Sequence, residues 1–166
     1  MSAAVQQFTP QPMPTITVDW DLAFENAVIK EAAAYWMSLR DERPMPSRGQ
    51  LRPAGMRNFL TFVNLVDIVD DSYVVTLQGA HTRQVFGHLA RQKFVNLFTE
   101  EEDKRWRYCF DLVRDSGKPV RLYTQVGTQQ QLWLDCEVFI APLGDGPQAI
   151  QSLFWIFKSW RNARPA

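Results

Sequence analysis

The sequence predicts an α+β protein: a five-stranded antiparallel sheet with helices on one face, preceded by an N-terminal amphipathic helix. Three observations predict this fold. Apolar residues recur at helical spacing near the N-terminus, five short runs rich in β-branched and aromatic residues follow, and polar turns separate most of these runs. The strands do not alternate with crossover helices, as a parallel sheet would require. A chain of 166 residues is long enough for one domain with its own core.

The two ends of the chain differ in sequence pattern from its centre. Residues 1–18 carry no charge, and prolines alternate with other residues near their end, which blocks a helix and favours a flexible, extended arm. We expect a single domain over residues 19–160 and a short tail over residues 161–166.

A helix is predicted over residues 22–40, because apolar residues recur there at helical spacing and Asp19 or Asp21 can cap its start. Its alanine-rich apolar stripe suits packing on a sheet or against the same helix of a second copy. The stripe includes Ile29, Ala33 and Trp36.

The next segment, residues 41–49, cannot be helical, because Pro44 and Pro46 push the residues before them toward extended geometry. Beyond it, β-branched and aromatic runs predict strands, and an acidic capping-box sequence predicts the start of the longest later helix. The predicted elements are strands over residues 59–69 and 73–77, a short helix over 82–86, a helix from Thr99 to Ser116, and strands over 120–126, 132–140 and 149–157.

The last strand is apolar on both faces: Phe154 and Ile156 alternate with Trp155 and Phe157. An antiparallel sheet with helices on one face should be polar on the other, so we expect the outer face to be covered. The N-terminal helix of the same chain or of a partner is the natural cover. This predicts a homodimer built from Ile29, Ala33, Trp36, Trp155 and Phe157.

Composition excludes several functions. Eighteen basic residues balance eighteen acidic ones, so no net field attracts nucleic acid. No apolar run approaches the roughly 18 residues that a membrane-spanning helix needs. With only Cys109 and Cys136 and no secretory signal at the N-terminus, we expect a cytoplasmic protein with reduced thiols.

Motifs for catalysis and metal binding are missing as well. His81 and His88 are the only histidines and do not have metal-ligand spacing, so no metal site is expected. One of them could ligate haem, but a polar or capping role is favoured. Ser47 lacks an accompanying histidine or carboxylate pattern, so we expect no enzyme and no catalytic residues. A small-molecule enzyme on this fold would have to use Asp135 or Glu137, the only carboxylates in mid-strand.

Two arginines, Arg43 and Arg48, bracket a rigid Pro-Met-Pro turn. Two guanidinium groups on a stiff loop can clamp a carboxylate or a phosphate. They can equally pair with carboxylates of the domain and pin the connector to it, and this structural interpretation is favoured.

The same connector carries a resemblance. Tyr35-Trp36, the run from Arg43 to Arg48 that reads RPMPSR, and Pro53 are similar to the start of a bacterial, largely alphaproteobacterial, family of stand-alone PAS-like domains. Its members read roughly YW-x-x-L-R-x-x-RPMPSR-x-x-x-x-P. The resemblance covers about residues 30–160 and implies a PAS fold and a role in signal transduction. It supplies no catalytic residues.

The cofactor remains unknown. A flavin photoreceptor of this fold would be expected to carry a reactive cysteine in an Asn-Cys-Arg type motif after the first short helices. Residues 91–96 read RQKFVN at that place, so no flavin adduct is expected.

These observations predict a PAS-like sensor that binds a small molecule or a protein partner. We expect it to relay a conformational shift through its N-terminal helix and sheet face. The candidate pocket residues are His81, Trp106, Phe110 and Trp133, which lie on the elements that line such pockets. The alternative is a ligand-free interaction or dimerisation module.

Overall fold

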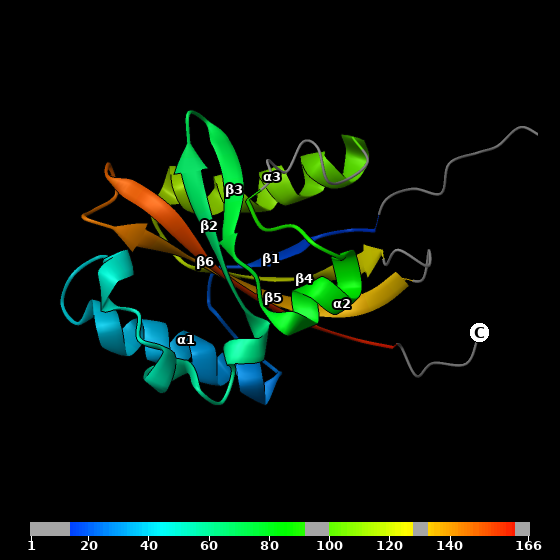
Figure 1. The fold of residues 1–166 in the computed structure, drawn as a ribbon, viewed down its shortest axis with the longest axis horizontal. Helices are drawn as coiled ribbons and strands as arrows, with labels where there is room; N and C mark the ends of the chain where they lie inside the picture. The colour runs from blue at the N-terminus through cyan, green and yellow to red at the C-terminus, as the bar shows by residue number, and fades with distance from the viewer. Residues whose placement is uncertain (1–13, 92–99, 128–132, 162–166) are drawn as a thin grey trace, which may run out of the picture.

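The fold is described from a computed structural model, which covers residues 14–91, 100–127 and 133–161 (Figure 1). Its centre is a six-stranded antiparallel sheet with the strand order β1-β4-β5-β6-β2-β3. The strands are β1 (Thr17–Asp19), β2 (Val63–Val69), β3 (Ser72–Leu77), β4 (Val120–Gly127), β5 (Trp133–Gly144) and β6 (Ile150–Trp160). The α-helices are α1 (Ala27–Arg40), α2 (Ala80–Phe86) and α3 (Glu100–Ser116), and three 3-10 turns are η1 (Arg48–Gln50), η2 (Pro53–Met56) and η3 (Leu60–Phe62).

The predicted fold class is confirmed, and the sheet has one strand more than the five expected. The additional strand β1 pairs with β4 at one edge of the sheet. The chain just before β1 is fixed by distant side chains: Thr124 Oγ1 donates to the carbonyl of Thr15 at 2.9 Å, and Arg105 donates to the carbonyl of Pro14 at 3.1 Å. A strand of three residues is too short to show an alternating pattern, and contacts with distant residues are not visible in the local sequence. The sequence therefore did not predict β1.

Helix α1 begins at Ala27 rather than at residue 22. The Asn26 side chain caps it by accepting the backbone N–H groups of Val28 and Ile29 at 3.0 and 3.3 Å. Asp19, one of the two expected caps, instead accepts the N–H groups of Asp21 and Ala23 in the turn that follows β1. An aspartate can serve either structure, so the sequence alone favoured the wrong start.

Helices pack on both faces of the sheet, with α1 on the opposite side from α3 (Figure 1). We call the two sides the α1 face and the α3 face; α2 also packs on the α3 face. Side chains alternate between the two faces along a strand, so β5 and β6 contribute residues to the packed layers on both faces. On the α1 face lie Phe139, Ala141, Leu143, Phe154 and Ile156. On the α3 face lie Cys136, Val138, Ile140, Trp155 and Phe157.

The outer face of β6 is therefore covered by α1 of the same chain. Trp36 is fully buried there, and its indole Nε1 donates to the carbonyl of Pro142 on β5 at 3.0 Å. Ile29 and Ala33 lie beside it and are 0% and 5% exposed. Within residues 14–91, 100–127 and 133–161, no helix has the length and apolar character needed to cross a membrane.

Candidate functional site

Aromatic rings fill the layer between the sheet and α3. Trp106 and Phe110 project from one face of α3, because residues four apart lie one turn above the other. The Trp106 ring centroid lies 4.9 Å from that of Trp155, and the Phe110 centroid lies 5.3 Å from it. Trp106 is 4% exposed and Phe110 is fully buried. We call Trp106, Phe110, Trp155 and Phe157 the aromatic cluster.

His81 on α2 extends this cluster. Its ring centroid lies 5.3 Å from that of Phe157 and 5.0 Å from that of Phe62. Its Nε2 accepts the backbone N–H of Ser159 at 3.2 Å and lies 2.9 Å from the Ser159 hydroxyl. Burial, and then the nearby Lys158 charge, lower the pKa of His81 below its usual range. The imidazole of His81 thus joins α2 to β6.

Trp133, the fourth candidate, does not join the other three. It is the first residue of β5 and is 40% exposed. It is not a member of the buried cluster that contains Trp106 and Phe110. Aromatic character alone could not tell whether the side chain is buried.

The residues expected to form the sheet cover are likewise divided between the two faces. Ile29, Ala33 and Trp36 belong to α1 and cover the α1 face. Trp155 and Phe157 belong to the aromatic cluster beneath α3. The two groups are separated by the sheet and do not form one surface.

A network of charged groups connects α1 to the sheet. Oε2 and Oε1 of Glu137 on β5 accept the backbone N–H groups of Glu25 and Asn26, each at 3.0 Å. Arg121 on β4 donates to Glu137 Oε2 at 2.9 Å and lies 3.5 Å from the Asp19 carboxylate. Glu137 is 1% exposed and Arg121 is 9% exposed. A charge in the middle of an apolar strand was the only sequence signal for this network.

Asp19 completes the network from β1. Its pKa is lowered mainly by the hydrogen bond from the Ala23 N–H, with burial opposing this effect and the Asp21 N–H and the Arg121 charge adding to it. Asp135, the other mid-strand carboxylate, accepts a hydrogen bond from Gln125 Nε2 at 3.1 Å. Both mid-strand carboxylates thus accept hydrogen bonds: Asp135 from β4, and Glu137 from β4 and from the segment before α1.

The two connector arginines have separate partners. Arg43 donates to the Gln50 side chain. Arg48 donates to Asp67 Oδ2 on β2 and to Thr76 Oγ1 on β3, each at 2.9 Å. Arg48 therefore ties the connector to two strands, and the two guanidinium groups do not converge in the structure.

Both thiols are buried in the α3-face layer and are not disulfide-bonded. Burial raises the pKa of Cys109 to about 12 and raises that of Cys136 well above its usual range. In the described part of the chain, no three His, Cys, Asp or Glu side chains are grouped to hold a metal ion. Residues 92–96, where a flavin-reactive cysteine would be expected, lie outside the described residues, as do Thr99, residues 1–13 of the arm and 162–166 of the tail.

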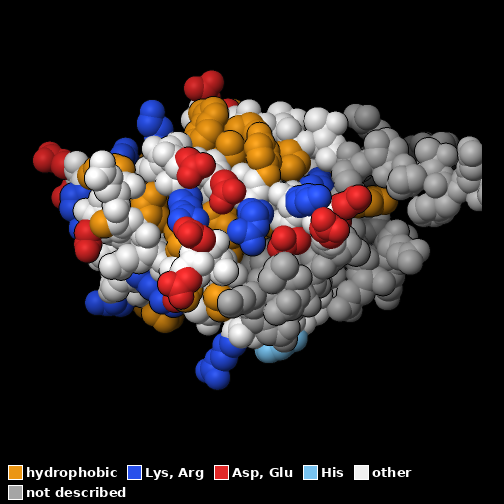
Figure 2. Space-filling view, turned by 90° about the horizontal axis from the view of Figure 1, so that it is seen from above, with side chains coloured by type: hydrophobic (Ala, Val, Ile, Leu, Met, Phe, Trp, Pro, Cys, Tyr) orange, Lys and Arg blue, Asp and Glu red, His pale blue; other side chains and the backbone are white. Residues whose placement is uncertain are grey.

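The surface seen in Figure 2 carries acidic and basic side chains next to one another, beside an apolar patch. Ion pairs of the described residues include Arg114 with Asp71 at 2.5 Å and Arg107 with Asp103 at 3.9 Å. On this face, charges of opposite sign are interspersed.

Sequence comparison gives the family of this domain. Residues 25–157 match the PAS domain family, so the chain belongs to that family. PAS domains are generally sensory and often mediate dimerisation. No curated protein matches the sequence significantly.

Two solved structures are similar to this chain. The LOV protein of Rhodobacter sphaeroides aligns over 86% of this chain and 72% of its own, with a TM-score of 0.50 and 12% identity. An RNA-binding light-oxygen-voltage receptor aligns over 69% of this chain with a TM-score of 0.48 and 13% identity. This chain covers only 35% of the length of that receptor. At such low identity, the similarity to the LOV protein shows the fold alone.

Proposed function

We propose that the chain is a PAS sensor in which a ligand or partner acts on the α3 face and β5 passes the resulting shift to α1. One observation carries this proposal: the Glu137 side chain on β5 binds the amides that precede α1. Because the buried carboxylate of Glu137 holds both amides, a movement of β5 changes the position of α1 directly. In this function, the chain has no catalytic step.

The middle of β5 contacts both layers. Cys136 and Val138 pack in the α3-face layer, and Glu137 between them points to the α1 face. A rearrangement of the aromatic cluster that shifts Cys136 or Val138 therefore also shifts Glu137. Shifts of this size matter because packed layers change between discrete arrangements rather than deforming continuously.

The alternative, a ligand-free interaction module, is favoured by a different observation. The rings of the aromatic cluster contact one another, with Trp155 and Phe157 centroids 5.5 Å apart. Trp155, Phe157 and Phe110 are fully buried. For a small molecule to enter among these side chains, they would have to move.

Hydrogen exchange tests the relay. We expect Phe110→Leu to speed exchange of the amides in the first turn of α1, and we expect this effect to disappear when Glu137→Gln is also present. A coupling of about 0.5 kcal/mol or more between the two changes supports the relay. Val75→Ala is the control, because Val75 is buried in the same layer but lies on the edge strand β3. Additive effects, or an equal response to Val75→Ala, would contradict the relay.

Native mass spectrometry tests ligand binding. A small molecule retained by the purified chain, and lost on Trp106→Ala, supports the sensor. If the measured mass is that of the polypeptide alone, and no compound of a metabolite library raises the melting temperature, the interaction module is supported.

Sedimentation at several concentrations tests the expected homodimer. The two free buried thiols are consistent with the cytoplasmic location that we propose.

A further inference from the structure

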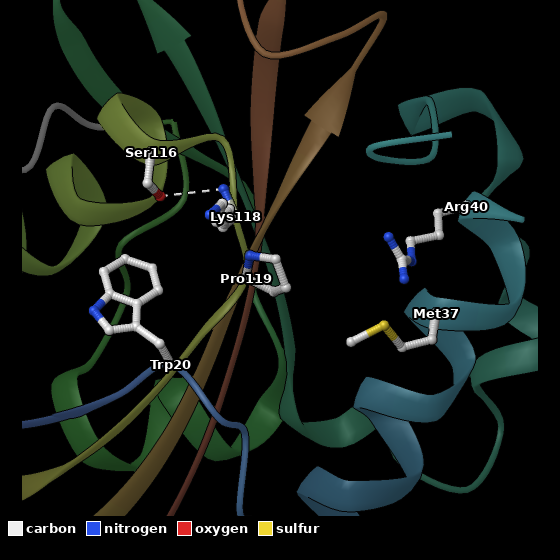
Figure 3. Close-up of a pocket in the computed structure, with 6 residues that line it drawn as sticks. All are labelled: Trp20, Met37, Arg40, Ser116, Lys118 and Pro119. Carbon is white, nitrogen blue, oxygen red and sulfur yellow. Dashed lines mark hydrogen bonds between the residues drawn. The ribbon is translucent and has the colours of Figure 1, made fainter. Parts of the chain in front are cut away.

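A groove lies outside the aromatic cluster, between the C-terminal half of α1 and the connection from α3 to β4 (Figure 3). Trp20, which follows β1, also borders it. The groove has a volume of about 730 Å³, within the range of roughly 300–1,000 Å³ that is typical of small-molecule sites. Its lining residues are Trp20, Met37, Arg40, Ser116, Lys118 and Pro119.

The charges lining this groove are all positive. Arg40 comes from α1 and Lys118 from the opposite side, and no carboxylate side chain belongs to the lining. Among the residues that the structure describes, neither Arg40 nor Lys118 forms an ion pair. The Ser116 hydroxyl accepts the backbone N–H of Lys118 at 3.1 Å, which leaves its own hydrogen free to donate. Three hydrogen-bond donors thus border one space.

The rest of the lining is apolar. Trp20 is 45% exposed, although tryptophan has one of the largest apolar surfaces to bury. In Figure 3, Met37 and Arg40 extend from α1 toward Pro119 and Lys118 on the other side. An apolar lining with a few converging polar groups is the usual composition of a site for small organic molecules.

We propose that this groove binds a small amphipathic organic anion, a carboxylate or a phosphate monoester on an apolar body. The anionic oxygens would bind Arg40, Lys118 and the Ser116 hydroxyl, and the apolar body would cover Met37, Pro119 and Trp20. Arg40 offers a planar fork of donors that matches either head group. The groove shares no lining residue with the aromatic cluster, so it is a separate site.

The same cations also have an effect in the empty protein. Arg40 is the last residue of α1, where a positive charge stabilises the negative end of the helix dipole. Loss of stability in an Arg40 variant is therefore expected with or without a ligand. A binding measurement is needed to separate the two roles.

The test is titration of the purified full chain with naphthalene-2-carboxylate and with 2-naphthalenemethanol, its neutral counterpart, followed by calorimetry and by amide chemical shifts. We expect the carboxylate to bind with amide shifts around Lys118 and Arg40, and the alcohol to bind at least about fivefold more weakly. Arg40→Gln and Lys118→Gln should each weaken carboxylate binding about two- to fivefold, and together about tenfold or more. The matched control is Arg83→Gln, which removes an exposed cation from the last turn of α2 and should change nothing.

The proposal is overturned if the carboxylate does not bind at millimolar concentration, or if it binds as tightly to the double variant as to the natural chain. Equal binding of the alcohol also overturns it, because the cations then contribute nothing. If only an acidic, tryptophan-containing peptide binds in an Arg40-dependent manner, the groove is a peptide site and the small-molecule proposal fails. Circular dichroism of each variant ensures that lost binding is not lost folding.

Discussion

The carboxylate of Glu137 and the guanidinium of Arg121 form a buried ion pair across β5 and β4. Oε2 of Glu137 lies 2.9 Å from both Nε and Nη2 of Arg121. Side-chain exposure is 11% for Arg121 and 1% for Glu137. Removing one member of such a pair leaves the other charge buried without its partner, which is the costly case for a buried ion pair.

We therefore expect Glu137→Ala to lower the free energy of unfolding by about 3–5 kcal/mol. The loss includes the two amides before α1, which lose their acceptor. Glu137→Gln keeps the shape of the side chain and one acceptor oxygen, so it should cost less and provides a folded variant if the alanine form does not fold. Urea denaturation followed by circular dichroism measures both.

The control for this prediction is Glu31→Ala on α1. Glu31 is exposed and accepts a hydrogen bond from Asn58 Nδ2 at 2.7 Å. Its loss should change the free energy of unfolding by no more than about 1 kcal/mol. Similar losses for Glu31→Ala and Glu137→Ala would show that the buried network does not stabilise the docking of α1.

The ion pair also illustrates what the sequence could and could not predict. The spacing of apolar residues predicted most strands and helices, because each such pattern is local. Apolar residues on both faces of β6 correctly indicated that its outer face is covered. The partners of Glu137 come from β4, 16 residues away, and from the segment before α1, 112 residues away. Only the strand register brings them together, so no local pattern could reveal the network.

The candidate pocket residues show the same limit. Trp106 and Phe110 were predictable as one buried face of a helix, because their spacing is helical. Trp133 and Trp106 were grouped because both are large and aromatic, yet Trp133 is 40% exposed at the start of β5 whereas Trp106 is buried beneath α3. The face of a strand's first residue depends on register and on how far the covering helix extends.

Gly79 provides a second prediction. A Cβ atom there would lie 2.3 Å from the carbonyl oxygen of Thr61, and this contact with backbone cannot be relieved by a side-chain rotation. We expect Gly79→Ala to destabilise the fold by about 1–3 kcal/mol, as overpacked sites do. Gly49→Ala is the matched control, because a Cβ atom at Gly49 meets no atom within 4 Å. Thermal melts of both variants decide the question, and equal melting temperatures would contradict the contact.

The thiols provide a third prediction. Because burial raises the pKa of Cys109 to about 12 and also raises that of Cys136, neither should form a thiolate at pH 8. We expect both to be unreactive toward Ellman's reagent in the native chain and to react once urea unfolds it. A Gln148→Cys variant, with a new thiol at an exposed position, should react immediately at one equivalent. Rapid reaction of the natural chain would contradict the buried positions.

The fourth prediction concerns pH and His81. Its pKa in the folded chain lies below the value of about 6.5 expected in the unfolded chain. Between these two values the unfolded chain binds more protons than the folded chain, so the free energy of unfolding falls as the pH is lowered through this range. The slope from one such histidine is at most about 1.4 kcal/mol per pH unit. Protonation also removes the lone pair with which Nε2 accepts the N–H of Ser159.

We expect the natural chain to lose stability between pH 7.5 and 5.5, a range above the titration of ordinary carboxylates. His81→Gln should be less stable at pH 7.5, because it loses the ring contacts with Phe62 and Phe157, but its stability should depend less on pH. His88→Gln is the control: His88 is exposed, so this variant should keep the pH dependence of the natural chain. Urea unfolding at several pH values measures all three. If His81→Gln retains the full slope, the pH dependence does not arise from the hydrogen bond between α2 and β6.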